Sequence, residues 1–480
     1  MKKWLLHIVF VFIWCNFFAQ VASGRLADFH WSTTENRHVH SAILPLIRQS
    51  STFDSLVPWI DSTDKKRRYL FQPAIDSYIQ YDTSFHFRTA AGVNFEKSWK
   101  KIYNRTSLIG GWSSREDHTQ NHAAFVPITS AKQAPFIDFR TRFTYTPNEF
   151  LHISTGIDNQ FFGEGYRSLI QGDQVAPSPY FQLRTNFWHL EYGILYQFLH
   201  ENNLSKNRLD WKYNTLHYLS WNATRNWNIT LLESVTFQGK DSTYRRGYEV
   251  EYLNPFVFFR PQEYSLGSTD NILLAAQTSV YYLKRKHAVY LQFVLDEFVL
   301  KAIMKRTKWW ANKYALQLGF KGTFKKWNYL VEGNIVRPYT FSHINSRQNG
   351  GNLGRPLGHY LGSNFVELLA QAQIPMKFVS ISFFSSFVLK GFDESAQSMG
   401  GDIYKNYITH PKEYGNTIGQ GLTQRFVNFQ ARISTYISKL QWELYFQTGF
   451  QYQWGDLKEQ TIPTLTFGIR SNLFQNRRLY

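Results

Sequence analysis

Cysteine and long apolar runs are scarce in this sequence. Its one cysteine, Cys15, lies within the apolar segment from Trp4 to Phe18, so the chain after that segment has no thiol and cannot be a disulfide-stapled scaffold. Beyond that segment, no apolar run reaches the ~20 residues that a membrane-crossing helix needs. The nearest, "FVSISFFSSFVL", is interrupted by serines. A bundle of membrane-spanning helices is therefore excluded.

The sequence also lacks the local signatures of common enzymes. It has no G-x-S-x-G nucleophile elbow, and Gly163 and Gly165 do not form a dinucleotide fingerprint because Ser168 occupies the third glycine position. His118 and His122 are four residues apart, but they lie on an expected loop, where that spacing gives no shared helical face for a metal. We therefore predict a protein that is not an enzyme, with no catalytic residue, metal or cofactor.

The beginning of the chain predicts export. Lys2 and Lys3 precede the apolar segment and small residues follow it, which indicates a signal peptide over 1–24. Residues 25–71 have helix-like spacings, proline breaks and a basic run. We expect them to form a short helical appendage, at the periplasmic rim or in the lumen of the following domain. A disordered leader is the alternative.

Aromatic residues are abundant and alternate with polar ones. They make up 18% of the chain while the mean hydropathy is −0.38, a combination that suits amphipathic strands. In "FIDFRTRFTYTP", Phe139 and Phe143 alternate with Arg140 and Arg142, which is the period of a strand with one apolar and one polar face. The same pattern predicts eighteen strands, near 72–80, 86–96, 101–112, 136–146, 149–159, 179–188, 190–199, 211–222, 226–237, 270–283, 287–296, 312–323, 327–336, 363–374, 378–389, 424–437, 440–452 and 462–474.

The connections between these strands differ in length from one rim to the other. Every second connection is only a few residues long, whereas the connections between them are mostly long, at 113–135, 160–178, 238–269, 297–311, 337–362 and 390–423. Short turns on one rim and long loops on the other are typical of outer-membrane barrels, in which every backbone group pairs within a closed sheet. The predicted fold class is an all-β, transmembrane antiparallel β-barrel of about 18 strands over 72–474, with long extracellular loops, short periplasmic turns and a tail at 475–480. A soluble sandwich or propeller is the alternative, but the chain has no internal repeat.

Charged and aromatic side chains gather in the predicted long loops. Sugar rings stack on aromatic faces and their hydroxyls bond to carboxylates, while arginine forks grip uronate or phosphate groups. An alternative role for these residues is to pair with one another and fold the loops inward. The candidate ligand-binding residues are Glu164, Tyr166, Arg167, Asp173, Arg260, Glu263, Asp296, Glu297, Trp309, Arg337 and His359.

The net charge is strongly positive and points to polyanionic neighbours. It is +18 for the whole chain and +16 once Lys2 and Lys3 are removed with the predicted signal peptide. For an exported protein these neighbours are acidic surface polysaccharide and lipopolysaccharide with other outer-membrane lipid, and not nucleic acid. We expect a monomer, inserted by the barrel-assembly machinery into the outer membrane of a Gram-negative bacterium.

Several motifs together resemble a known family. The segment "FFGEGYRSLIQGDQVAPSPYF", followed in order by "LDEF", "WWANKYALQLG", "VRPYTFSH" and "PLGHYLGSNFVE", is similar to the Wzi capsule-assembly family of outer-membrane barrels, and most of all to its RemB-like gliding-motility branch. The first motif matches the family's glycine-rich loop at Gly163, Gly165, Ser168, Leu169, Asp173, Pro177 and Pro179. It departs at Phe161 and Phe162, where classical members often have tryptophan, and at Gln174 and Val175.

The resemblance implies an eighteen-stranded barrel with a lectin-like role in attaching capsular polysaccharide to the cell surface. The predicted function is therefore a non-enzymatic outer-membrane protein that binds or organises surface polysaccharide, in capsule assembly or as an accessory to gliding motility. Two alternatives stay open. The chain could be a diffusion channel for anionic solutes, favoured by its basic charge, or an outer-membrane hydrolase, for which the sequence nominates no nucleophile.

Overall fold

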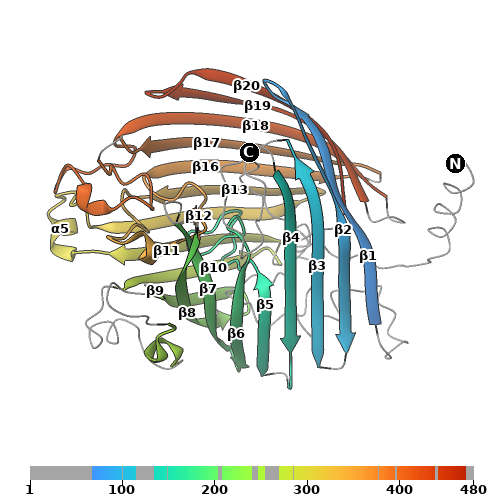
Figure 1. The fold of residues 1–480 in the computed structure, drawn as a ribbon, viewed down its shortest axis with the longest axis horizontal. Helices are drawn as coiled ribbons and strands as arrows, with labels where there is room; N and C mark the ends of the chain where they lie inside the picture. The colour runs from blue at the N-terminus through green and yellow to red at the C-terminus, as the bar shows by residue number, and fades with distance from the viewer. Residues whose placement is uncertain are drawn as a thin grey trace, which may run out of the picture.

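The chain forms a single eighteen-stranded antiparallel sheet that closes on itself (Figure 1). The structure is a computed structural model that describes residues 68–99, 101–114, 134–148, 150–203, 208–239, 247–254, 270–284, 286–376, 378–394, 397–437 and 442–471. The strands of the barrel are β1 (Arg68–Tyr81), β2 (Phe85–Trp99), β3 (Ile102–Ser113), β4 (Ala134–Tyr145), β5 (Leu151–Asp158), β6 (Ser178–Phe187), β7 (Leu190–Asn203), β8 (Arg208–Thr224), β9 (Trp227–Gln238), β10 (Asn271–Tyr282), β11 (His287–Glu297), β12 (Lys313–Phe324), β13 (Trp327–Val336), β16 (Phe365–Pro375), β17 (Ser380–Phe392), β18 (Leu422–Ile437), β19 (Trp442–Gly455) and β20 (Gln460–Ser471).

Each barrel strand pairs with the strands before and after it, and the two ends of the series pair with each other. In the closing pair, Gln80 of β1 lies opposite Thr466 of β20, and the backbone N–H of Ile75 donates to Ser471 Oγ at 2.9 Å. The closing register runs from Asp76 opposite Arg470 to Tyr81 opposite Leu465, and a sheet closed in this way can cross a bilayer with strands. The predicted fold class and strand count are confirmed.

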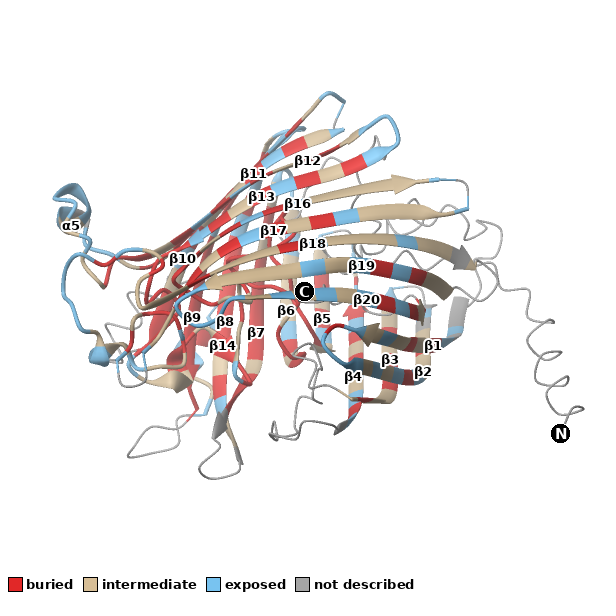
Figure 2. Cartoon of the chain, turned by 90° about the horizontal axis from the view of Figure 1, so that it is seen from above, coloured by how far each residue is buried: buried red, intermediate tan, exposed pale blue. Residues whose placement is uncertain are grey.

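Side chains alternate between the outside and the lumen all the way round the barrel. On β12, Leu316 and Leu318 point outward and are exposed, whereas Gln317 between them is fully buried in the lumen. Figure 2 shows this alternation of burial along the strands. At the turn end several of the exposed side chains are aromatic, including Phe187 and Trp188, which are 73% and 70% exposed. An apolar band bordered by aromatic residues is the outer surface expected of a barrel in a membrane.

The two ends of the barrel differ in the length of their connections, as the sequence predicts. The turn end has short connections, such as 188–189 between β6 and β7 and 325–326 between β12 and β13. The loop end carries 159–177, 298–312, 337–364 and 393–421. Three connections at this end are short as well, at 82–84, 204–207 and 456–459.

Short additional elements lie in the loops. These are η3 (Val250–Leu253), α5 (Leu300–Met304), η4 (Ser346–Gln348), the hairpin of β14 (Gly351–Asn352) and β15 (Arg355–Pro356), and η5 (Tyr407–Thr409). Among the described residues, no helix is long and apolar enough to cross a membrane. β1 begins at Arg68, four residues before the predicted start of the barrel, and the predicted signal peptide, most of the predicted appendage and the tail lie outside the described residues.

Candidate functional site

The loop between β5 and β6, residues 159–177, folds into the lumen and is called the plug here. Its glycines allow a close approach to the barrel wall. A Cβ on Gly163, whose φ is +122°, would lie 2.1 Å from Gln292 Nε2, and a Cβ on Gly165 would lie 2.4 Å from Glu332 Oε2. A side chain at either position would have to displace these wall side chains or shift the plug, so the Gly-x-Gly motif fits a loop that docks against strands.

Glu332 on β13 is the main anchor of the plug. Its carboxylate accepts hydrogen bonds from the backbone N–H groups of Tyr166 (2.6 Å) and Arg167 (3.0 Å). The hydroxyl of Tyr290 (2.7 Å) and the amide of Asn334 (3.0 Å) donate to the same carboxylate. Because the side chain is fully buried, these four donors replace the water that an ionised carboxylate would otherwise bind.

A second buried carboxylate, Glu367 on β16, receives the side chain of Arg167. Arg167 Nη2 lies 3.4 Å from Glu367 Oε1, and its guanidinium lies 4.4 Å from the centre of the Tyr360 ring. His359 Nε2 lies 2.7 Å from Glu367 Oε2. Arg167 and His359, both predicted to bind ligand, therefore meet at one carboxylate inside the barrel, as the loop-locking alternative proposes.

The acidic residues of the plug are also held by the protein. Glu164 Oε2 lies 2.8 Å from Lys321 Nζ, and Tyr281 donates to Glu164 Oε1 at 2.8 Å. Asp173 is 3% exposed, and its backbone carbonyl accepts from Asn159 Nδ2 at 2.7 Å. The plug is thus attached to β10 and β12 as well as to β13 and β16.

The loop 337–364 between β13 and β16, called the strap here, crosses the plug from the loop end. Asp296 accepts a hydrogen bond from the backbone N–H of Phe341 at 2.7 Å, which ties the strap to β11. Gly172 of the plug donates to the carbonyl of Leu357 at 2.7 Å. Arg337, 9% exposed at the start of the strap, donates to the carbonyl of Trp309 at 3.2 Å. The plug is therefore enclosed between the wall and a second loop.

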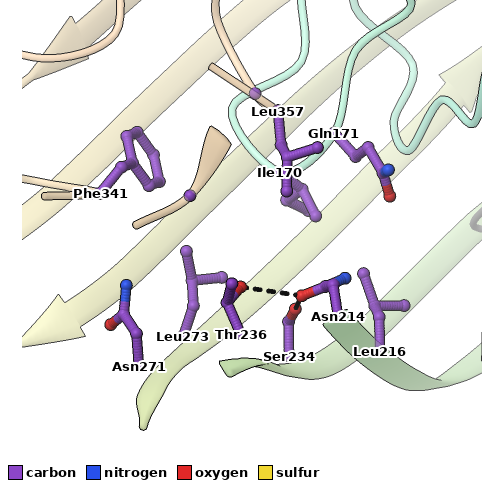
Figure 3. Close-up of a pocket in the computed structure, with 12 residues that line it drawn as sticks. Ile170, Gln171, Asn214, Leu216, Ser234, Thr236, Asn271, Leu273, Phe341 and Leu357 are labelled. Carbon is purple, nitrogen blue, oxygen red and sulfur yellow. Dashed lines mark hydrogen bonds between the residues drawn. The ribbon is translucent and has the colours of Figure 1, made fainter. Parts of the chain in front are cut away.

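A small cavity remains where the plug, the strap and the wall meet (Figure 3). Its volume is about 30 Å³, which fits one or two water molecules and not a sugar ring. Its lining is Ile170, Gln171, Asn214, Leu216, Ser234, Thr236, Asn271, Leu273, Phe341, Gly350, Leu357 and Gly358. This cavity is therefore too small to be the site of a glycan.

At the loop end, two loops build an aromatic cluster that we call the rim platform: Trp309, Trp310, Tyr407, His410 and Glu413. The carboxylate of Glu413 accepts from both indole N–H groups, at 3.3 Å and 3.1 Å, and lies 2.9 Å from His410 Nε2. The hydrogen bond from His410 lowers the pKa of Glu413. His410 also stacks on Trp310, with ring centres 4.4 Å apart. Glu413 thus fixes the orientation of two tryptophans beside solvent.

The backbones of the same two loops are joined beneath the rim platform. Trp310 N–H donates to Glu413 O at 2.9 Å, Gly415 N–H to Thr307 O at 3.0 Å, and Asn416 N–H to Lys308 O at 3.0 Å. Lys313 places its ammonium 4.2 Å from the centre of the Tyr407 ring. These contacts fix the two loops relative to each other.

The structure separates the predicted ligand-binding residues into two groups. Seven are buried in contacts within the protein: Glu164, Tyr166, Arg167, Asp173, Asp296, Arg337 and His359. Glu297, which pairs with Lys313 at 3.1 Å, and Trp309 are partly exposed at the loop end. Arg260, Glu263 and the histidines His118 and His122 lie outside the described residues. Among the described residues, no group of three His, Cys, Asp or Glu side chains is arranged to hold a metal ion.

Sequence reasoning missed the partners of the plug and half of the rim platform. Glu332 and Glu367 lie on the polar faces of predicted strands, so alternation alone could have placed them in the lumen. His410 and Glu413 have no periodic or motif signal, because they meet Trp310 only through the fold of a loop about a hundred residues later in the chain.

These features define a class: a closed eighteen-stranded barrel of the outer-membrane type with an inward-folded plug. No known protein-family profile and no curated protein matches the sequence. Among solved structures the chain is similar to Wzi of Escherichia coli, described as an outer-membrane protein involved in group 1 capsule assembly and as a carbohydrate-binding β-barrel. The TM-score is 0.58 at 12% identity, over 95% of this chain and 99% of that one.

Barrels from Pseudomonas aeruginosa are also similar at lower scores. OprD gives a TM-score of 0.46 at 8% identity, over 84% of this chain and 94% of that one. OccK2 (OpdF), in complex with glucuronate, gives 0.47 at 5% identity, over 84% and 97%. Identities of this size show the fold alone, so the predicted relationship to the RemB-like branch stays a prediction.

Proposed function

We propose that this protein is a non-enzymatic outer-membrane barrel that binds surface polysaccharide at its loop end. The rim platform carries this proposal, because it presents oriented aromatic rings and a solvent-facing carboxylate, the groups on which sugar rings and hydroxyls bind. The plug supports it, since a loop locked to the wall by buried carboxylates obstructs the lumen beneath. The fold likeness to Wzi, a carbohydrate-binding barrel, is in keeping with the proposal. Attachment of capsule or assistance in gliding would follow from such binding.

Removal of an accessible ring of the rim tests the proposal. Trp309→Ala and Tyr414→Ala, the latter at a side chain that is 60% exposed next to Glu413, should weaken binding of the purified, detergent-solubilised protein to the producing cell's surface polysaccharide. Loss of one aromatic contact at the centre of a binding surface is expected to cost about 1–2 kcal/mol, roughly fivefold to thirtyfold in affinity. Binding is measured by glycan pull-down and titration.

The matched control is an aromatic residue at the other end of the barrel. Trp188→Ala removes a tryptophan that is 70% exposed at the turn end, and it should leave glycan binding unchanged. If the wild-type protein binds none of the cell's own polysaccharides, the proposal is wrong. If Trp188→Ala weakens binding as much as Trp309→Ala, the loop end is not the site.

A diffusion channel for anionic solutes is the second candidate. Partly buried arginines line the lumen on strands other than β10, β12, β13 and β16, which anchor the plug. They are Arg432 on β18, Arg470 on β20 and Arg88 on β2. Arg470 and Arg88 each pair with a carboxylate, Glu443 at 2.5 Å and Asp76 at 2.9 Å. Single-channel conductance with anion selectivity would favour this function over polysaccharide binding.

A further inference from the structure

The loop between β11 and β12 begins with a cationic and apolar segment, Phe298–Lys308, that contains α5. We call this segment the basic knob. Its cations are Lys301, Lys305, Arg306 and Lys308, all exposed, and it contains no acidic residue. Among the described residues, none of these four cations forms a salt bridge. Four uncompensated charges within eight residues make this a strongly positive part of the loop end.

Apolar side chains accompany the charges and are also exposed. Phe298 is 48% exposed, Val299 44%, Ile303 41% and Met304 75%. Figure 2 shows α5 as an exposed helix beyond the ends of β11 and β12. A soluble acidic glycan would neutralise the cations but would leave these apolar side chains in water. A partner that carries both anionic groups and hydrocarbon fits the whole segment better.

The position of the basic knob relative to the membrane follows from strand length. β11 has 11 residues, and its outward side chains are apolar from Val289 to Leu295. A barrel strand crosses the apolar band in ~9–11 residues, so β11 ends at the upper boundary of the band. Phe298 follows directly after β11, and the basic knob therefore starts at the level of the lipid head groups.

The backbone of the basic knob is fixed before any partner binds. Arg306 and Lys308 have positive φ angles of 53° and 52°, which non-glycine residues keep only where the surroundings enforce them. Arg306 N–H donates to Ile303 O at 2.9 Å and Thr307 N–H to Ala302 O at 3.1 Å, while Asn416 of the neighbouring loop bonds to Lys308 O. The backbone that carries the cations therefore needs little reordering on binding.

We propose that the basic knob binds the phosphate groups of anionic glycolipid in the outer leaflet, with Ile303 and Met304 entering the boundary between head groups and acyl chains. Lys301, Ile303 and Met304 lie on α5, and the other three cations follow within four residues of its end. Cationic and apolar side chains placed together are what peripheral segments use to bind anionic membranes. This site is separate from the rim platform. It anchors one side of the loop end to the membrane surface next to the polysaccharide site.

The probe is lipid A carrying its phosphates, compared with the same lipid after removal of both phosphates. Binding of each form to the purified full-length protein in detergent is measured by titration and by native mass spectrometry. The wild-type protein should bind the phosphorylated form at least about tenfold more tightly, since each basic residue near an anionic surface adds substantially to binding. The variant carrying Lys301→Gln, Lys305→Gln, Arg306→Gln and Lys308→Gln should lose this preference.

The chain offers a control with the same number of charges. Lys284→Gln, Lys286→Gln, Lys325→Gln and Lys326→Gln remove four exposed lysines at the turn end, and this variant should keep the wild-type preference. Met304→Glu, a single change that leaves all four cations in place, should weaken binding of both lipid forms. Its failure to do so would overturn the apolar part of the proposal.

Two results would overturn the proposal as a whole. The first is that the fourfold loop-end variant, without the cations of the basic knob, keeps the wild-type preference for phosphorylated lipid A, or that the turn-end control loses this preference equally. The other is that the loop-end variant loses binding to polygalacturonate, a soluble acidic polysaccharide, while it keeps its preference for phosphorylated lipid A. Neither result bears on Trp309, so a failure here leaves the proposed function of the rim platform standing.

Discussion

Glu332 and Glu367 attach a loop to strands that lie more than 150 residues away in the sequence. Arg167 contributes to both attachments, since its backbone N–H donates to Glu332 and its guanidinium pairs with Glu367. Removing one member of a buried charged network lowers the free energy of unfolding by more than the intact network contributes to it, because the remaining groups stay buried without partners. We therefore expect stability to depend strongly on Glu332 and Glu367, because each is the shared acceptor of several buried donors.

Glu332→Ala is expected to destabilise the barrel. It removes the acceptor of two backbone N–H groups and of the Tyr290 hydroxyl, all buried, and should lower the free energy of unfolding by at least about 3 kcal/mol. Urea titration of the protein in lipid vesicles measures this loss. Glu332→Gln keeps one acceptor oxygen and should lose less. Exposed Glu251→Ala should stay within about 0.5 kcal/mol of wild type, and an equal loss there would contradict this interpretation.

His343 in the strap makes stability depend on pH. Burial, with the positive charge of Lys313, lowers its pKa to about 4 from the ordinary 6.5. Between these values the unfolded chain binds a proton that the folded chain does not, so stability falls as the pH drops through this window, by up to about 3 kcal/mol. His343→Gln should remove this part of the slope between pH 6.5 and 4.

The measurement is the unfolding free energy of wild type and His343→Gln at a series of pH values. At pH 8 His343 is neutral in both states, so any difference there reports packing alone and serves as the baseline. Parallel curves from pH 8 to pH 4 would show that His343 does not titrate as its burial implies.

At the scale of elements, strands are predicted well and loop contacts are not. A strand of this barrel can be recognised from its own sequence, because one face meets lipid and the other faces the lumen. The resulting alternation of apolar and polar residues is visible in segments such as β12. The plug gives no comparable signal. Its glycines and Arg167 indicate a special loop, but its partners are set by register between distant strands, which no local pattern contains. α5 has five residues, too few to show a helical period.

Shortening the plug should open the lumen. Replacing residues 161–176 by a two-glycine linker removes the packed loop without cutting any strand, so the barrel should still form and the single-channel conductance in a planar bilayer should rise severalfold. A barrel of this strand number has a lumen wide enough for an aqueous path once it is empty. The same replacement at 299–307, a loop outside the lumen, should leave the current unchanged. An unchanged current after plug removal would mean that the plug is not what limits flow.

At the scale of the whole molecule, the outer surface defines how the barrel sits in a bilayer. Leu318 is 55% exposed near the middle of β12, whereas Phe324 is 61% exposed at its turn end. Leu318→Arg should cost about 2–4 kcal/mol of stability in lipid vesicles, and Phe324→Arg only about 0–1 kcal/mol, because the penalty falls with distance from the midplane. Equal penalties at the two sites would contradict this placement. In detergent, the difference between the stability penalties of Leu318→Arg and Phe324→Arg should be smaller.

The pairing of β1 with β20 joins residues 396 positions apart in the chain, as between Ile75 and Ser471. It has a consequence for biogenesis. Every other neighbouring pair consists of strands that are consecutive along the barrel sequence, so these strands can pair before the chain is complete. The pairing of β1 with β20 cannot form until the final strand is available. Until then the growing sheet has two open edges that template aggregation. A chain that ends before β20 should therefore be a substrate for periplasmic proteolysis and not a smaller barrel.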